Sequence, residues 1–479
     1  MHARVDAAVR DAQLQQFVGR ATTHKDTQRA EAFAAAFGRR YDDVRRHAGA
    51  IKQHTLDHLD TYLEEFVRNA TAAGATMHVA RDAPAACEIA RKIARSHGCK
   101  LCVKSKSMVT EEIELVAALE AIGVETIETD LGEFILQLDG DAPSHIVTPM
   151  IHKDRGAVAR AFARELGVEY TDDPAELTAT ARRYLREKYR RADLGVSGGN
   201  FLIAETGSLV LCTNEGNGGF CTAGPPVHVA FVGIEKLIPR FEHLGVFLKL
   251  LARSSTAQPL TSYTQIITGP RRRYERDGPR ELHIVLVDNG RTNLLRPESR
   301  ELLRCIRCGA CLNTCPVYRK IGGHAYGSVY SGPIGALLTP HLRGLENYRD
   351  LPEASSLCGA CYAACPVHID IPRHLIRLRT ESVERRLAPW SSRATLRVWG
   401  RILRRKWTYE LAAWIQREAL RSMSEPVAIQ ASATDAGPGA PFDDWITSAG
   451  GPLRAWTAER DFPTPAAESF RQWWRRERT

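Results

Sequence analysis

Four successive stretches of the chain differ in how apolar and polar positions alternate. Residues 1–72 are polar and rich in alanine with helical spacing, which predicts a helical N-terminal arm. In residues 73–290 short apolar runs alternate with amphipathic helical runs, which predicts an α/β domain. Residues 291–388 combine helical spacing with short loops and cysteines. Residues 389–479 form a basic extension that is rich in tryptophan and expected to be helical.

The α/β region is expected to contain a parallel sheet covered by helices on both sides, because strand and helix patterns alternate along it. The expected strands are Thr76–Ala80, Lys100–Lys104, Val124–Thr126, His145–Thr148 and Leu282–Val287, and the expected helices are Ala85–His97, Thr110–Ile122 and Ala157–Leu166. Glu111, Glu112 and Glu114 would occupy the first turn of the second helix, where carboxylates favour the helix dipole.

A glycine-rich stretch at residues 194–233 interrupts this alternation. Phe201–Leu211 and Val227–Val232 have the composition of β segments, and Gly195–Asn200 and Asn214–Gly219 are expected to be loops. Glycine permits tight turns between strands, and it also lets backbone N–H groups converge on an anion. Spacing alone favours turns, because neither a GxGxxG nor a Walker pattern is present. If the region binds a ligand, the candidate side chains are Lys104, Ser105, Lys106, Ser107, Glu205 and Asn214.

Seven cysteines between residues 305 and 365 form two related runs. The first is Cys305-Ile-Arg-Cys308-Gly-Ala-Cys311-Leu-Asn-Thr-Cys315-Pro316, and the second is Cys358-Gly-Ala-Cys361-Tyr-Ala-Ala-Cys365-Pro366. The first run has the C-x₂-C-x₂-C-x₃-C-P spacing that holds iron–sulfur clusters. Zinc sites usually take four ligands from two separated pairs, so zinc fits this pattern poorly.

The last cysteine of such a run ligates the other cluster in two-cluster ferredoxins, so the two runs are expected to exchange their last cysteines. This assigns Cys305, Cys308, Cys311 and Cys365 to one cluster and Cys315, Cys358 and Cys361 to the other. Ser355 stands where a complete second run would have cysteine. The open corner could carry a serine oxygen, another group such as His324, a partner's ligand or nothing. An empty corner would give a three-iron cluster or a labile iron, and an ordinary loop histidine is the simpler interpretation of His324.

The remaining composition indicates a cytoplasmic protein. Twelve cysteines in a chain without a visible export signal favour metal ligands over disulfides. No apolar run of about 18 residues is present, so no membrane span is expected. The net charge of +9, from 65 basic and 56 acidic residues, is mild. Because no helix-turn-helix or other reading element is evident, nucleic acid is not an expected partner.

Basic and apolar residues interleave after Pro366. The basic ones are Arg373, Arg377, Arg379, Arg385, Arg386, Arg393, Arg397, Arg401, Arg404, Arg405 and Lys406. Such a stretch can lie on the inner face of an anionic membrane or on an electron acceptor, and it can also be a solvated face of the cluster domain. Ala431–Pro441 has the composition of a linker. The tail tryptophans Trp445, Trp456, Trp473 and Trp474 are expected to pack on the chain or on a partner.

Several motifs together resemble the lactate utilisation protein B family, the iron–sulfur subunits of a bacterial L-lactate oxidation system. They are the cysteine runs, the segments Gly323–Gly327 and Gly332–Gly335 between them, the glycine-rich region Gly198–Gly224, and the tail segments Trp456–Pro463 and Ser469–Trp474. Many electron carriers share the cysteine motif alone. Its combination with an upstream α/β domain is much more specific.

The resemblance implies an α/β domain similar to the NagB/RpiA/CoA-transferase-like fold, called a LUD domain. It implies an α-helical ferredoxin-like domain after it, with two [4Fe-4S] clusters on the same two cysteine sets that the spacing gives. It also implies two partners, a cysteine-rich subunit and a second subunit with a LUD-type domain, which act together to convert L-lactate to pyruvate.

Electron transfer is the function that the residues themselves favour. No flavin or nicotinamide motif and no evident base for lactate are present, so substrate chemistry is expected on a partner or at an unidentified site in the α/β domain. An alternative is that the α/β domain binds or converts a CoA ester, a sugar phosphate or a folate, with the clusters as accessories. A third hypothesis is a redox or iron sensor.

Overall fold

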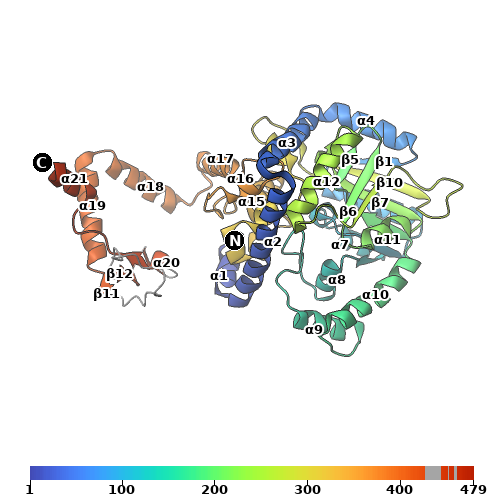
Figure 1. The fold of residues 1–479 in the computed structure, drawn as a ribbon, viewed down its shortest axis with the longest axis horizontal. Helices are drawn as coiled ribbons and strands as arrows, with labels where there is room; N and C mark the ends of the chain where they lie inside the picture. The colour runs from blue at the N-terminus through green and yellow to red at the C-terminus, as the bar shows by residue number, and fades with distance from the viewer. Residues whose placement is uncertain (427–443, 451–452, 458–460, 479) are drawn as a thin grey trace. The chain divides into compact units, whose positions relative to one another are not determined.

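A six-stranded parallel sheet lies at the centre of the larger of two units in the computed structural model (Figure 1). The structure describes residues 1–426, 444–450, 453–457 and 461–478, so the expected linker at 431–441 lies outside the described residues. The larger unit is Met1–Leu387 and the smaller is Ala388–Thr479. The finer division of the chain into four regions stays a prediction.

The parallel sheet has the strand order β1-β10-β7-β4-β2-β3. Its strands are β1 (Thr76–Ala80), β2 (Leu101–Lys104), β3 (Glu125–Glu128), β4 (Leu194–Ser197), β7 (Val227–Gly233) and β10 (Glu281–Val287). All residues of β7 are buried, as expected for a central strand with helices on both faces. The parallel pairing confirms the predicted α/β fold class.

A second, smaller sheet has the order β8-β5-β6-β9. Its strands are β5 (Phe201–Ile203), β6 (Ser208–Thr213), β8 (Leu237–Ile238) and β9 (Tyr263–Ile267). The helices of the α/β region are α5 (Ala83–Ser96), α6 (Met108–Glu112), α7 (Leu115–Glu120), α8 (Leu131–Leu138), α9 (Arg155–Leu166), α10 (Pro174–Arg191), α11 (Asn217–Ala223) and α12 (Phe241–Thr256).

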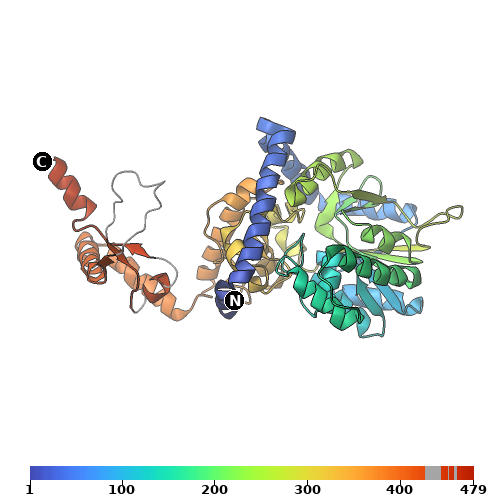
Figure 2. The same ribbon diagram turned by 60° about the horizontal axis from the view of Figure 1, so that its bottom comes forward.

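The N-terminal residues form helices, as predicted: α1 (His2–Arg10), α2 (Ala12–Phe37), α3 (Tyr41–Asp57) and α4 (Leu59–Ala72). The cysteine region contains α13 (Ala310–Asn313), α14 (Pro316–Ile321), α15 (Gly332–Arg343), α16 (Ala360–Ala364) and α17 (Ile371–Glu384). The long helix α2 packs on α12, α13 and α14, and both views show it beside the cysteine region (Figures 1 and 2). The helical arm therefore packs against one side of the cysteine region.

One predicted strand is absent from the described structure. His145–Thr148 is a bend, and the prediction of a strand there was wrong. Nδ1 of His145 accepts hydrogen bonds from the backbone N–H groups of Val147 (3.0 Å) and Thr148 (3.1 Å). These local bonds curl the backbone, so its N–H groups are not available to a sheet.

The predicted helix Thr110–Ile122 is interrupted, and the predicted loop at Asn214–Gly219 is partly helical. Helices α6 and α7 are separated at Glu114, whose φ of 57° lies in the left-handed region. The last residues of the loop begin α11, which starts at Asn217. Phe201–Leu211 is a hairpin, with Phe201 paired to Val210 across a turn.

The smaller unit consists of helices with few buried residues and a three-stranded sheet. Its elements are α18 (Trp390–Leu403), α19 (Lys406–Arg421), β11 (Glu425–Pro426), β12 (Asp444–Ile446), α20 (Arg454–Thr457), β13 (Phe462–Pro463) and α21 (Phe470–Arg478). Helix α21 packs on α19, where Arg471 lies 3.6 Å from Glu410 and 5.1 Å from the ring centre of Tyr409. Among the helices in the described part of the chain, none is long and apolar enough to cross a membrane.

Five buried side chains form a closed ring at the carboxyl end of the large sheet, and we call it the buried charge ring. Its members are Glu112, Glu235, Arg291, Arg307 and Tyr330. Arg291 lies 2.8 Å from Glu112 and 2.7 Å from Glu235, and Arg307 lies 3.3 Å from the other oxygen of Glu235. The Arg307 guanidinium stacks 4.8 Å from the ring centre of Tyr330, whose hydroxyl donates to Glu112 at 2.5 Å.

Replacing Arg291 is expected to destabilise the larger unit strongly. Arg291→Met would leave the carboxylates of Glu112 and Glu235 buried without their main partner, at a cost of about 3–5 kcal/mol. Urea unfolding followed by circular dichroism measures the loss. Arg296→Met, which removes an exposed arginine five residues away, is the control and should change stability by less than about 0.5 kcal/mol. Equal effects of the two substitutions would contradict a structural role for the ring.

Candidate functional site

The two cysteine runs fold in the same way. Gly309 and Gly359 follow Cys308 and Cys358 and adopt φ values of 76° and 82°, which favour glycine. Each glycine turns the chain into a short helix, α13 or α16, that carries the next cysteine of its run. Helices α13 and α16 contact each other, so the two runs lie side by side.

Backbone N–H groups approach sulfur atoms of both cysteine runs. Sγ of Cys315 caps α14 and accepts from the N–H of Tyr318 at 3.5 Å. Sγ of Cys365 accepts from Ile369 at 3.3 Å, and Sγ of Cys305 accepts from Arg307 at 3.4 Å. Hydrogen bonds to sulfur favour a thiolate and, where a cluster is bound, raise its reduction potential.

The electrostatic neighbours of the thiols divide them into two groups. Burial raises the pKa of Cys308 to about 12, and the nearby Cys305 and Cys365 add to this rise. Burial also raises the pKa of Cys361 to about 12, with Cys315 and Cys358 as its neighbours. Cys311 has neighbours in both groups, since Cys305, Cys308, Cys361 and Cys365 all raise its pKa beyond the effect of burial. The same two groups were expected from spacing, and the ligand assignment itself stays a prediction.

A cavity of about 360 Å³ adjoins the first cysteine run. It lies at the carboxyl ends of β2 and β4, between Ser105–Val109 and Gly198–Asn200. The connections from β2 and β4 lead to opposite sides, to β3 and β7, and such a switch point is where open α/β sheets bind ligands. Arg307 and Tyr330 of the buried charge ring form part of the cavity wall. The cavity therefore lies between the α/β region and the cysteine region.

Four of the six candidate ligand residues line this cavity, and two do not. Those that line it are Ser105, Lys106, Ser107 and Asn214. Lys104 is fully buried away from it, with its ammonium group 2.7 Å from Glu128 and 2.9 Å from Glu111. Glu205 caps α12 instead, because its carboxylate accepts the N–H of Phe241 at 2.9 Å. A ligand role for Lys106 and Asn214 stays a prediction.

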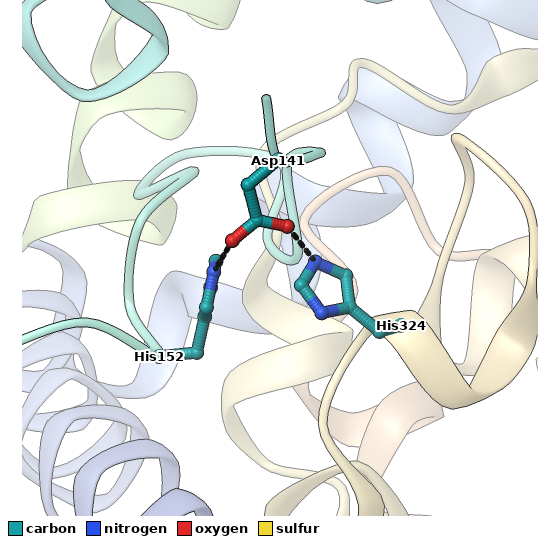
Figure 3. A group of neighbouring side chains, drawn as sticks. All are labelled: Asp141, His152 and His324. Carbon is teal, nitrogen blue, oxygen red and sulfur yellow. Dashed lines mark hydrogen bonds and ion pairs between the residues drawn. The ribbon is translucent and has the colours of Figure 1, made fainter. Parts of the chain in front are cut away.

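His324 contacts the loop before α9, as expected of an ordinary loop histidine (Figure 3). Its Nε2 lies 2.8 Å from the carbonyl oxygen of Ala142 and 3.9 Å from Asp141, and Nε2 of His152 lies 2.9 Å from the same carboxylate. The three side chains are close enough to hold one metal ion. However, the Lys153 ammonium lies 2.8 Å from Asp141, so the carboxylate charge is already paired. Ser355, which stands where the second run lacks a cysteine, is half-buried, and its hydroxyl accepts from the N–H of Leu357 at 3.1 Å.

Comparisons with known proteins cover nearly the whole chain. A LUD domain model matches residues 63–287, a 4Fe-4S dicluster domain model matches residues 301–369, and a model of the lactate utilisation protein B C-terminal region matches residues 377–479. Lactate utilization protein B of Geobacillus sp. (strain WCH70) is 44% identical over 99% of this chain and 96% of its own. The chain belongs to the lactate utilisation protein B family.

Two further relatives support the same family assignment. The protein of the same name from Anoxybacillus flavithermus (strain DSM 21510 / WK1) is 43% identical over 98% of this chain and 96% of its own. That from Bacillus velezensis (strain DSM 23117 / BGSC 10A6 / LMG 26770 / FZB42) is 44% identical over 91% and 88%. A solved DUF162 family structure from Deinococcus radiodurans covers 48% of this chain with 16% identity and a TM-score of 0.26, a likeness too weak to support an argument. The chain is thus an iron–sulfur protein of lactate utilisation.

Buried polar groups around the cysteines fit an iron–sulfur cofactor. Five side-chain groups near the cysteines are buried and have no hydrogen-bond partner in the described structure: Tyr41 OH, Arg45 Nε, Arg307 Nη1, Asn313 Nδ2 and Tyr326 OH. All five can donate a hydrogen bond, and a buried donor without an acceptor is costly. The sulfides and thiolates of a cluster are acceptors, so the site is built for an acceptor that the protein itself does not supply.

No trio of cysteine sulfurs in the described residues is as compact as the ligands of one zinc ion. Within the described residues, no three cysteine sulfurs lie within 4.8 Å of one another. Four sulfurs bound to one zinc would be about 3.8 Å apart, given Zn–S bonds of about 2.3 Å. All twelve cysteines are free of disulfides, so the thiols remain available as ligands.

Sequence reasoning missed the charged residues that support the site. Arg45 of α3 donates to the carbonyl oxygens of Tyr362 (2.6 Å) and Ala363 (3.0 Å) in α16, between Cys361 and Cys365. Glu235 and Lys236 are buried although they lie in a charged pair inside the apolar run Ile234–Ile238. Charged residues inside an apolar run are a usable signal of a buried ion network, whereas nothing near Arg45 in sequence indicates its partners.

Removing Arg45 is expected to loosen the second cysteine run. Arg45→Met would free two carbonyl groups of α16, with a loss of about 1–3 kcal/mol and faster iron release. The rate of iron transfer to a chelator under anaerobic conditions measures the effect. Arg46→Met is the matched control, because the neighbouring Arg46 is exposed and pairs only with Asp43 among the described residues. Equal rates in the two variants would contradict this role of Arg45.

Proposed function

We propose that this chain is the electron-transfer subunit of a system that oxidises L-lactate to pyruvate. The observation that carries the proposal is that the seven cysteines form two neighbouring groups, which approach each other at Cys311 and Cys361. Buried hydrogen-bond donors without acceptors surround both groups. Two [4Fe-4S] clusters bound to these thiols would accept and pass electrons one at a time. Cys305, Cys308, Cys311 and Cys365 would hold one of them, and Cys315, Cys358 and Cys361 the other. With three cysteines, the second cluster could instead be [3Fe-4S] or carry a labile iron.

The difference in solvent exposure between the two cysteine groups supports an electron path from the group around Cys308 to the group that contains Cys358. The group around Cys308 adjoins the cavity at the α/β region, through Arg307 and Ser255. In the other group Cys358 is exposed. Electron transfer falls off steeply with distance, so a path from a buried donor site to an exposed exit would use the groups in this order. The proposed exit at Cys358 is where a partner or acceptor would dock.

The family name supports work with other subunits, which we propose to be a cysteine-rich subunit and a second LUD-type subunit. We propose a cytoplasmic site of action, to which the free thiols of all twelve cysteines are suited. The exposed Trp390, Trp399, Trp407 and Trp414 of α18 and α19 are interleaved with arginines. Such a surface suits contact with the inner face of a membrane or with an electron acceptor.

A second candidate function is that the α/β domain itself binds or converts a ligand such as a CoA ester, a sugar phosphate or a folate. The cavity at the switch point of the sheet favours it, because that is the usual ligand site of open α/β sheets. Both functions can coexist if the ligand is the electron donor.

Metal analysis of the purified chain tests the cofactor. Anaerobically purified protein is expected to contain about eight iron and eight sulfide atoms per chain for two four-iron clusters. Cys365→Ala should lower the iron content by about half, since it removes one ligand of the first group. Cys87→Ala replaces a buried cysteine of α5 and should leave the content unchanged. Stoichiometric zinc, or wild-type protein without a paramagnetic signal after reduction, would overturn the proposal.

Lactate-driven reduction tests the division of labour between subunits. L-lactate added to this chain alone should leave its visible spectrum unchanged. The same addition after mixing with the cysteine-rich and second LUD-type subunits should bleach the spectrum, because electrons then enter the clusters. Bleaching of the chain alone would place substrate oxidation on this chain and favour the second candidate function.

A further inference from the structure

Lys236 is a buried cation in the cavity wall. It follows β7 in the short segment Ile234–Lys236, and 7% of its surface is exposed. Across the described residues, its ammonium group has no hydrogen-bond or ion-pair partner. A buried charge without a partner is costly, so proteins keep one where a ligand or another charge completes the site.

Glu235 and Cys305 attract the Lys236 ammonium group, but neither forms a hydrogen bond or ion pair with it among the described residues. Both oxygens of Glu235 are already taken, one by Arg291 at 2.7 Å and the other by Arg307 at 3.3 Å. A second buried lysine, Lys52, adds positive charge, and its ammonium donates to the carbonyl oxygens of Glu235 and Leu237. Cations therefore exceed carboxylates on this side of the cavity.

The other cations on the cavity wall have ion-pair partners, Lys106 with Asp130 and Arg307 with Glu235, whereas Lys236 has none among the described residues. Lys106 donates to the carbonyl oxygen of Val147 at 2.7 Å and lies 3.8 Å from Asp130. Asp130 and Glu215 line the cavity from the loops after β3 and β6, and Lys236 lines it from the segment after β7. A ligand in the cavity would thus meet a cation on the β7 segment and carboxylates on the other two loops.

The shape of the cavity suits a small molecule. Its volume of about 360 Å³ is at the lower end of the range for small-molecule sites. Gly198 lets the β4 loop approach the β2 loop, because a Cβ there would lie 2.5 Å from the Ser107 hydroxyl oxygen. The wall between these loops is therefore narrow and polar, with hydroxyl groups from Ser105 and Ser107.

We propose that this cavity binds a small anionic molecule whose carboxylate or phosphate group pairs with Lys236. The anion would lie beside the first cysteine run, because Arg307, between Cys305 and Cys308, is part of the same wall. Binding of the anion does not require the electron-transfer role, so it is tested separately from the proposed function. The two sources of the anionic group are a short 2-hydroxy or 2-oxo acid and a phosphate.

Calorimetric titration of the anaerobically purified full chain tests the proposal. L-lactate and pyruvate represent the carboxylate source, and inorganic phosphate represents the other. Wild-type protein should bind at least one of them at a single site, and Lys236→Met should weaken that binding at least tenfold. Lys236→Arg keeps the charge and should bind within a few-fold of wild type. Lys249→Met removes an exposed lysine of α12 and should bind like wild type.

Iron content and thermal midpoint are measured for each variant without ligand. Because Lys236→Met removes a buried charge that no ligand balances, its midpoint should equal or exceed that of wild type with full iron content. Loss of iron in Lys236→Met would show that the lysine balances the charge of the first cysteine group instead, which would overturn the proposal. Absence of binding of all three anions to wild type at millimolar concentration, or equal binding by Lys236→Met, would also overturn it.

Discussion

The buried charge ring is the constraint on which the relation between the sheet and the cysteines depends. Two of its members, Glu235 and Arg291, follow the carboxyl ends of β7 and β10, and Arg307 lies between two cysteines of the first run. Although burial alone would raise it, the guanidinium groups of Arg291 and Arg307 hold the pKa of Glu235 at about 2. The Glu235 carboxylate therefore stays charged at neutral pH and is paired with both guanidinium groups. Gly233 must be glycine, because a Cβ there would lie 2.1 Å from a Glu235 oxygen.

The parts of the fold that follow from local pattern were predictable from the sequence. Strands β1, β2 and β10 were expected within one residue of their observed ends, since each is a short apolar run bounded by polar residues or glycine. Features whose structure depends on residues far away in the sequence were not predictable. Glu112 reads as a helix-dipole carboxylate, but Arg291, 179 positions away, draws it into the interior. The sequence places His145 in a strand, but its imidazole accepts a hydrogen bond from the backbone N–H of Val147 and bonds the side chain of Asn313.

The candidate site likewise has parts that the sequence predicted and parts that it did not. The spacing of the cysteines encodes their grouping, because ligands of one cluster are near in sequence or related by a repeated motif. The residues that hold and charge the site come from other elements: Arg45 from the arm, Glu235 and Lys236 from the end of β7. Lys104 shows the reverse case. It was a candidate only if the glycine-rich region binds a ligand, and its ammonium group lies buried among the carboxylates of Glu111, Glu128 and Glu133.

The core of the cysteine region extends well beyond the cysteine region itself. One continuous apolar cluster includes Phe33 and Ile51 of the arm, Phe247 of α12, and Leu312 and Leu375 beside the cysteines. Burying the unpartnered hydrogen-bond donors in this cluster costs free energy until a cofactor supplies acceptors for them. Cofactor binding and packing of the arm on the cysteine region therefore stabilise each other. The α/β sheet, whose strands pair independently of the cysteines, supplies a rigid edge on which the buried charge ring can position both the cysteines and the cavity.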